Sequence, residues 1–226
     1  MRTVLPVAFL FCINIAFAQT GKFYSVKVGE VPNEVLPIEA MYLLPHFTAG
    51  TAFMRDGSSA AEKFNYNFLL DEMHFITAGG DTLAISEPLL LKSVVIDSMV
   101  FYYDKGYVRQ IFERHNYKLA LKQQMVQVAD KTRGAYDAAS GASSIKTYGI
   151  INNNGQIYQL QVKKDVFFRE VISFYFSDAF NHFLKASKKN FMTVFPKEDL
   201  AKYLKQHKVN FNNEADLKAL LQFCAE

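Results

Sequence analysis

Short runs of alternating apolar and polar residues fill the chain from 51 to 128. Alternation of this kind is typical of antiparallel strands with one buried face, and the Gly, Asp and Asn pairs between the runs predict tight turns. The pattern predicts a meander of about seven strands, which includes a hairpin within residues 72–85. Asp81 follows two glycines in this hairpin and is interpreted as a turn residue.

Two apolar stretches leave alternatives open. Residues 117–128 change phase, since Tyr117 and Leu121 share one face whereas Val126 lies on the other. This change predicts either a bulge or a strand that passes from one sheet edge to another. Residues 165–176 are apolar on both faces, which favours a covered central strand, with a buried helix as the alternative.

The remaining segments differ in composition. Residues 129–146 are rich in Ala, Ser and Gly, and predict a mobile connection that is either a solvated crossover, which is favoured, or a lid. An Asn-Gly pair within 148–162 predicts another hairpin. Residues 19–50 contain three prolines and are interpreted as an irregular lead-in, with a candidate strand at Phe23–Val28. Two amphipathic segments within 194–226 predict a C-terminal pair of helices.

We therefore expect an α+β fold that is mainly β: an antiparallel meander or half-barrel-like sheet with a C-terminal two-helix appendage. The expected organisation is a signal peptide over 1–18, the lead-in over 19–50, a β domain over 51–193 and a helical pair over 194–226 packed on that domain.

The N-terminus carries the features of an export signal. A charged start precedes an apolar run over Val4–Phe17, and the small residues Ala16 and Ala18 precede the expected cleavage between Ala18 and Gln19. The run is shorter than the roughly 20 residues that cross a bilayer. We expect an exported protein, periplasmic or extracellular, with no transmembrane segment in the mature chain. Peripheral association with a membrane stays open.

Composition narrows the classes of partner. Half of the residues are hydrophobic, 21 are Phe, none is Trp, and the formal net charge is +3. A balance this close to neutral gives no electrostatic argument for nucleic acid. Cys224 is the one cysteine outside the signal peptide, so an internal disulfide is excluded.

Catalytic and cofactor motifs are missing from the sequence. It contains no Gly-x-Ser-x-Gly, phosphate-loop, dinucleotide or His-Glu-x-x-His pattern, so no catalytic residue, cofactor or metal site is predicted. Asp81 and Asp97 lack the glycine that completes the loop of an aspartic protease. Glu72 and His74 share a strand face and could ligate a metal, but an exposed, charge-balanced strand face is the favoured interpretation.

Two sets of aromatic residues are candidates for binding. The first set surrounds one hairpin end and consists of Tyr102, Tyr103, Tyr107 and Arg109. Tyr and Arg often anchor interfaces, although cross-strand packing of the rings explains the same pattern and is favoured. The second set would line an apolar cavity and consists of Phe168, Phe174 and Phe176.

Three stretches carry a resemblance to known proteins. They read KFNYNFLLDEMHFITAGGDTLAI at 63–85, FYYDKGY at 101–107 and FPKEDLAKYLKQHKVNF at 195–211. Together they resemble a group of exported proteins common in Bacteroidota, over most of the mature chain. The resemblance implies placement in the envelope or outside the cell. It brings no catalytic motif and implies no activity.

Three hypotheses for function follow. The leading one is an exported, non-enzymatic protein of the cell envelope that binds or assembles with a protein partner. The second is a carrier of an apolar, lipid-like ligand held in a curved sheet under a loop, which would require an apolar cavity of several hundred Å³. The third is a hydrolase, for which Glu72, His74, Asp81 and Asp97 would have to converge in one cleft.

Overall fold

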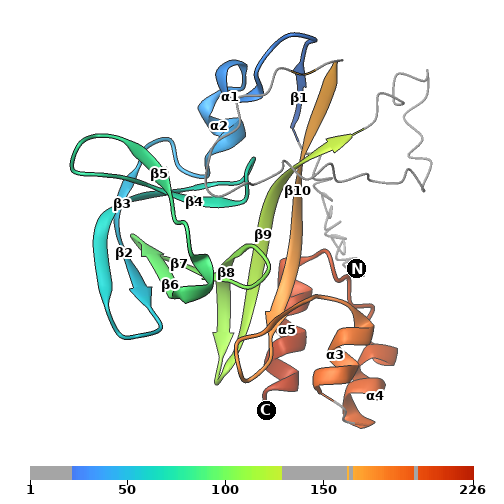
Figure 1. The fold of residues 1–226 in the computed structure, drawn as a ribbon. Helices are drawn as coiled ribbons and strands as arrows, with labels where there is room; N and C mark the ends of the chain where they lie inside the picture. Colours follow the sequence, from blue (N-terminus) through green and yellow to red (C-terminus); the bar gives the residue numbers. More distant parts are fainter. Residues whose placement is uncertain (1–21, 129–161, 163–164, 196–197) are drawn as a thin grey trace, which may run out of the picture.

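The computed structural model describes residues 22–128, 162, 165–195 and 198–226 (Figure 1). The predicted signal peptide at 1–18, with its cleavage site between Ala18 and Gln19, lies outside the described residues. So do the predicted connection at 129–146 and, apart from Val162, the hairpin predicted within 148–162.

The described part of the chain forms an 11-stranded antiparallel sheet that does not close. Its strands are β1 (Phe23–Val26), β2 (Thr48–Met54), β3 (Ser59–Asn67), β4 (Glu72–Ile76), β5 (Thr82–Ala84), β6 (Leu91–Ile96), β7 (Met99–Tyr103), β8 (Tyr107–Arg114), β9 (Tyr117–Val128), β10 (Val166–Ser177) and β11 (Phe183–Lys185). Their order is β1-β10-β9-β8-β7-β6-β2-β3-β4-β5, and β11 pairs with β10. The expected α+β, mainly β fold is confirmed.

Strand β10, which follows β1 in the sheet order, resolves the ambiguous stretch at 165–176. It pairs with β9 from Phe167↔Val128 to Phe176↔Leu119, and β1 and β11 pair along its other edge. The apolar run at 165–176 is therefore a covered strand and not a helix, because both of its edges and much of both faces are occupied.

The phase change in β9 has a different origin from a bulge in that strand. The register between β9 and β10 is continuous, whereas the pairing of β8 with β9 is irregular between Gln110 and Phe112. This pairing ends at Arg109↔Leu121, and β9 then continues beside β10. The two ends of β9 have different neighbours, so its apolar residues face different surroundings.

Six short helical segments accompany the sheet. They are α1 (Pro32–Val35), α2 (Ile38–Met41), the 3-10 turn η1 (Pro88–Leu90), α3 (Lys188–Val194), α4 (Glu198–Gln206) and α5 (Glu214–Cys224). The expected C-terminal pair of helices is present as α4 and α5, and a third helix, α3, which was not predicted, precedes it. Ser187 caps α3 by accepting a hydrogen bond from the Asn190 amide. The first turn of α3 is polar, so the sequence shows no apolar periodicity that would predict this helix. No helix among the described residues is long and apolar enough to cross a bilayer.

Two large hydrophobic cores occupy the two ends of the long strands β9 and β10 (Figure 1). The first lies among β2, β3, β4, β6 and β7 and includes Phe64, Tyr66, Met73, Phe101 and Tyr107. The second lies between the lower ends of β9 and β10 and the helices α3–α5, and includes Leu119, Phe176, Phe191, Leu217 and Leu221. Phe176 stacks on Phe191 with 4.0 Å between ring centroids.

Candidate functional site

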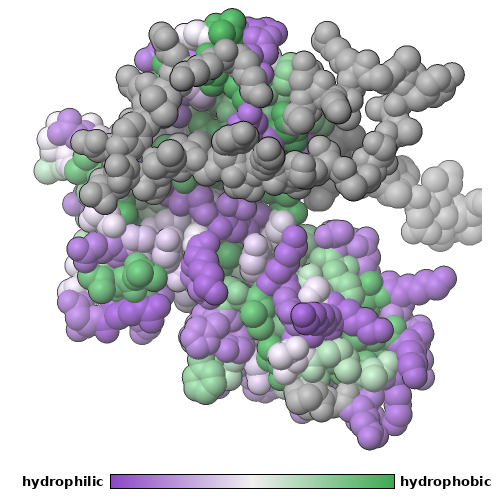
Figure 2. Space-filling view, turned by 45° about the vertical axis from the view of Figure 1, so that its right-hand side comes forward, coloured by the Kyte–Doolittle hydropathy of each residue, from purple (hydrophilic) through white to green (hydrophobic). Residues whose placement is uncertain are grey.

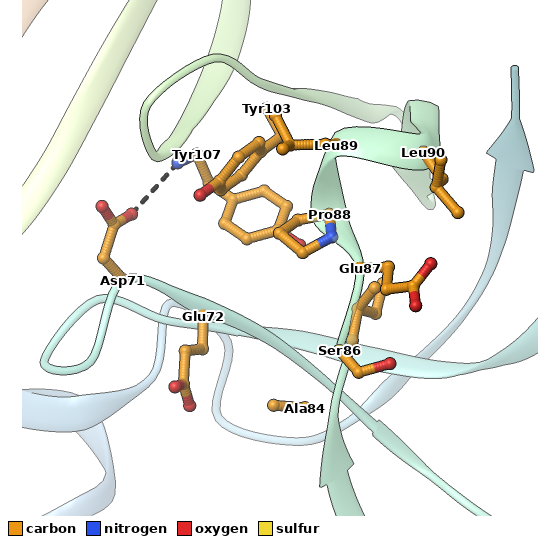
Figure 3. A pocket seen from close by; sticks show the side chains of 11 residues that line it. Asp71, Glu72, Ala84, Ser86, Glu87, Pro88, Leu89, Leu90, Tyr103 and Tyr107 are labelled. Carbon is orange, nitrogen blue, oxygen red and sulfur yellow. Dashed lines mark hydrogen bonds between the residues drawn. The ribbon is translucent and has the colours of Figure 1, made fainter. Parts of the chain in front are cut away.

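A cavity of about 520 Å³ opens beside the β5 end of the sheet. Its lining residues come from the β3–β4 turn, the segment that joins β5 to β6, and the β7–β8 hairpin: Asp71, Glu72, Ala84, Ile85, Ser86, Glu87, Pro88, Leu89, Leu90, Tyr103 and Tyr107 (Figure 3). Ligand sites commonly have volumes of roughly 300–1,000 Å³ and combine apolar walls with a few polar groups. The cavity fits this description in both size and lining.

Asp71 joins the structural elements that form one wall. Its carboxylate pairs with Lys122 Nζ at 2.7 Å and accepts a hydrogen bond from the Tyr66 hydroxyl at 2.8 Å. It also accepts a hydrogen bond from the Tyr107 amide at 3.1 Å (Figure 3). The β3–β4 turn, strand β9 and the start of β8 are thereby held together. Asp71 has φ +58°, a conformation that Asp adopts more readily than most residues.

Gly106 allows this close approach. Its φ is +122°, and a Cβ atom at this position would overlap Lys122 Nζ and Asp71 Oδ2. The absence of a side chain in the β7–β8 turn is thus required by the backbone conformation and by the adjacent ion pair.

Glu72, the next residue along, belongs to a hydrogen-bonded chain that leads away from the cavity. Glu72 Oε2 lies 2.9 Å from His74 Nε2, and His74 Nδ1 lies 2.9 Å from the Tyr42 hydroxyl. An ionised carboxylate only accepts hydrogen bonds, so His74 Nε2 carries the proton that it donates to Glu72. Burial raises the pKa of the Tyr42 hydroxyl; a hydrogen bond from Asn67 lowers it, and the nearby Glu72 charge raises it.

The interpretation of this strand face as exposed was wrong. His74 is fully buried and Glu72 is 9% exposed. The segment around Tyr42 and Leu44 covers the face, because the Leu43 amide bonds to the Tyr66 carbonyl and Asn65 bonds to both backbone groups of Leu44. A polar strand face can be buried at low cost when a covering backbone satisfies its hydrogen bonds.

The hydroxyl of Tyr107 is the exception among these buried polar groups. Tyr107 is 3% exposed, and its Oη has no hydrogen-bond partner among the described residues. Its ring extends along the cavity toward Pro88, with Tyr103 packed edge-on at 5.0 Å (Figure 3). Burial raises the pKa of the Tyr107 hydroxyl strongly, and the neighbouring Tyr103, Asp71 and Glu72 act in the same direction.

The structure separates the four hairpin candidates. Tyr103 and Tyr107 line the cavity. Tyr102 packs against Phe183 and donates a hydrogen bond to Gln110, in a third, small core on the other side of the hairpin. Arg109 is half-buried, and desolvation lowers the pKa of its guanidinium, while Glu214 of α5 opposes that shift.

The three candidate lining phenylalanines are buried in two different cores. Phe168 belongs to the first core, whereas Phe174 and Phe176 belong to the second. None of them is among the described residues that line the cavity.

The candidate acids of a hydrolase are dispersed. Asp81 lies exposed in the β4–β5 turn, where the Thr77 amide donates to its carbonyl, which confirms the turn interpretation. Asp97 lies exposed in the β6–β7 turn with φ +52°. Of the four, Glu72 and His74 alone contact one another. Within 22–128, 165–195 and 198–226, no three His, Cys, Asp or Glu side chains are placed to hold a metal ion.

Strand β5 forms the edge of the sheet beside the cavity. The Ile85 amide donates to the Met73 carbonyl and the Thr77 amide to the Asp81 carbonyl. Bonding in an antiparallel pair alternates, so Leu83 pairs with β4 and the amides of Thr82 and Ala84 face outward. No strand of the described chain pairs with this outer side.

Exposed leucines lie on β5 and in η1, which lines the same cavity. Leu83 is 48% exposed, Leu89 72% and Leu90 50%. On the face of the molecule seen in Figure 2, by contrast, hydrophobic areas of the described residues are interspersed with hydrophilic ones.

We found no family model that matches the chain, and no match among curated proteins or solved structures.

Proposed function

We propose that this chain is an exported, non-enzymatic protein of the cell envelope that binds an extended segment of a protein partner along the outer edge of β5. The observation that carries the proposal is the unpaired edge of β5 with three exposed leucines beside it and a cavity next to it. Export is supported by the apolar N-terminal run and the small residues before Gln19.

Strand addition is the binding mode that suits this edge. Outward backbone groups of Thr82 and Ala84 can pair with an extended peptide, and the neighbouring leucines and cavity can receive its side chains. An edge left open in this way is also a liability for aggregation, which proteins limit by keeping edge strands short. Strand β5 has three residues, so a partner would gain a few backbone bonds and would depend on side-chain contacts for affinity.

The cavity favours this function over carriage of a lipid. Asp71, Glu72 and Glu87 stand in its wall, and an acyl chain would remove water from these carboxylates without replacing their hydrogen bonds. A partner segment brings its own polar groups and avoids this cost.

Native mass spectrometry of the mature protein, purified gently from its own envelope fraction, tests the proposal. We expect a reproducible complex with a second protein, and a photo-crosslinker at Leu83 should capture that protein. The same crosslinker at Lys202, exposed on α4, is the matched control and should not. Thr82→Pro, which removes one outward amide, should weaken the complex.

Three outcomes would overturn the proposal. A bare monomer would exclude a stable partner, and a complex captured equally from Leu83 and Lys202 would place the partner elsewhere. A reproducible added mass of lipid size would instead support the carrier of an apolar ligand.

A further inference from the structure

The open sheet has an edge at each end, and the edge opposite β5 in the strand order is β1 (Figure 1). The Glu170 amide of β10 donates to the Lys22 carbonyl at 3.3 Å. Bonding in an antiparallel pair alternates, so the backbone groups of Phe23 and Ser25 face away from β10. No strand in the described parts of the chain pairs with this outer side of β1.

The outward backbone groups of β1 fit those of β5 in an antiparallel pairing. Such a pairing would place Phe23 opposite Ala84 and would also place Ser25 opposite Thr82. Each of these pairs would exchange two backbone hydrogen bonds. Registers shifted by two residues in either direction would leave one of the two pairs beyond the end of β5.

Side chains at the two edges would cover one another in this register. Tyr24 would lie opposite Leu83, which is 48% exposed, on the face of the sheet that carries the first core. On the other face Phe23, which is 63% exposed, would lie opposite Ala84. Aromatic side chains in cross-strand pairs contribute to the stability of a sheet, and the contact removes apolar surface from water.

The two edges carry opposite charges. Asp81 and Glu87 flank β5, are exposed, and have no ion pair within the described structure. Lys22 flanks β1 and is likewise exposed and without an ion pair among the described residues, and Lys27 at its other end pairs with Asp165 but stays 59% exposed. In the antiparallel register Lys22 is a diagonal neighbour of Glu87, within reach of a long side chain. Lys27 comes next to Asp81.

These charges favour the pairing of unlike edges. If β5 paired with β5 of a second copy, Asp81 of one copy would approach Glu87 of the other. A pairing of β1 with β1 would bring lysines together in the same way. Like charges across neighbouring strands are destabilising, and charged residues at short edge strands commonly prevent such contacts. Pairing of β1 with β5 avoids both repulsions.

We propose that this protein assembles head to tail, with the β1 edge of one copy added to the β5 edge of the next. The inference rests on the proposed function, because it identifies the extended segment that binds β5 as residues Phe23–Val26 of a second copy. Such a contact is heterologous, so every added copy leaves one β1 edge and one β5 edge available. The assembly therefore grows into a chain or closes into a ring.

Sedimentation velocity of the purified mature chain measures this assembly, and the average mass should rise with concentration beyond that of a dimer. Lys22→Glu and Glu87→Lys should each weaken association about three- to fivefold, the size expected for an exposed ion pair. A mixture of the two variants should recover the association, because the altered β1 edge of one then meets the altered β5 edge of the other. Lys208→Glu, which changes an exposed lysine after α4, is the control and should have no effect.

A disulfide locates the contact. Tyr24 and Leu83 would form a non-hydrogen-bonded pair with Cα atoms about 4.5 Å apart, which is within the range of a disulfide. Tyr24→Cys mixed with Leu83→Cys should give a covalent dimer on oxidation, and neither variant should do so alone. Ser25→Cys mixed with Leu83→Cys is the control, because the two thiols would lie on opposite faces of the sheet. The native Cys224 is buried.

Several results would overturn the inference: a monomer at every concentration, no recovery in the mixture of charge variants, or association without the disulfide between positions 24 and 83. Circular dichroism of each variant establishes that a loss of association does not reflect unfolding. Failure of the inference can be told apart from failure of the proposed function. A photo-crosslinker at Leu83 that captures a different protein from the envelope would overturn self-assembly and leave β5 as a docking site.

Discussion

Replacing Tyr107 by Phe should stabilise the protein, which is unusual for a change at a residue that is 3% exposed. Its hydroxyl is desolvated without a partner in the described structure, and such a group costs about 1–3 kcal/mol. The ring, which supplies the apolar contacts with Tyr103, is retained in Phe. We therefore expect the free energy of unfolding to rise by about 1 kcal/mol in Tyr107→Phe, measured by urea denaturation.

Tyr66→Phe is the matched control. The Tyr66 hydroxyl also lies in the first core, but it bonds to Asp71 Oδ1 at 2.8 Å and to the Gln123 carbonyl at 3.1 Å. Losing a bond to a charged acceptor should lower the free energy of unfolding by about 2 kcal/mol. The two variants should thus differ by about 3 kcal/mol, or about 6–12 °C in melting temperature for a chain of this size.

The refuting result is a loss of stability in Tyr107→Phe similar to that in Tyr66→Phe. It would mean that the Tyr107 hydroxyl has a hydrogen-bond partner in the folded protein.

Two further predictions concern the same region. Gly106→Ala should lower the free energy of unfolding by at least about 2 kcal/mol, because its Cβ would displace the ion pair between Asp71 and Lys122. Gly57→Ala is the control: this glycine has φ +92° and open space around it, so the change should cost only about 1 kcal/mol of backbone strain. Equal losses of stability in the two variants would contradict this prediction. Burial raises the pKa of Tyr66 and of Tyr107 above the ordinary value of 10.0, so stability should be fully present below pH 10 and fall above it, by up to about 1.4 kcal/mol per pH unit for each hydroxyl. Tyr107→Phe should flatten this decline in alkaline denaturation measurements, and an unchanged slope would show that Tyr107 ionises alike in the folded and unfolded chain.

Local sequence patterns predicted most of the strands, but they missed β11 and did not indicate that β6 pairs with β2. Alternating residues and glycine turns placed the hairpin around Asp81 and the strand that became β10 within a residue or two of the observed bounds. The reason is that period-two alternation and turn chemistry act over a few neighbouring residues. Helix α3 was not predicted, because it has only seven residues and a polar first turn, which give little apolar periodicity.

The cavity depended on contacts that no local pattern reveals. Glu72 and His74 alternate with apolar neighbours as an exposed face would, and their burial follows from the irregular segment around Tyr42 that covers them. The role of Asp71 depends on Lys122, which lies far along the chain in β9. The sequence indicated Tyr103 and Tyr107 as candidate interface residues. It could not indicate that the Tyr107 hydroxyl lacks a hydrogen-bond partner in the described structure, because this depends on the three-dimensional geometry.

Strands β9 and β10 contribute to both large cores, so neither core is expected to fold without the other. Removing the chain from Ser187 onward would expose Leu119 and Phe176, and the same two strands carry Met125 and Phe168 of the other core. Their ladder is continuous over ten residue pairs, so disorder at one end would propagate toward the other. The C-terminal helices are therefore expected to exchange their amide hydrogens in the same cooperative step as the sheet, and truncation before them should unfold the whole protein rather than yield a smaller stable domain.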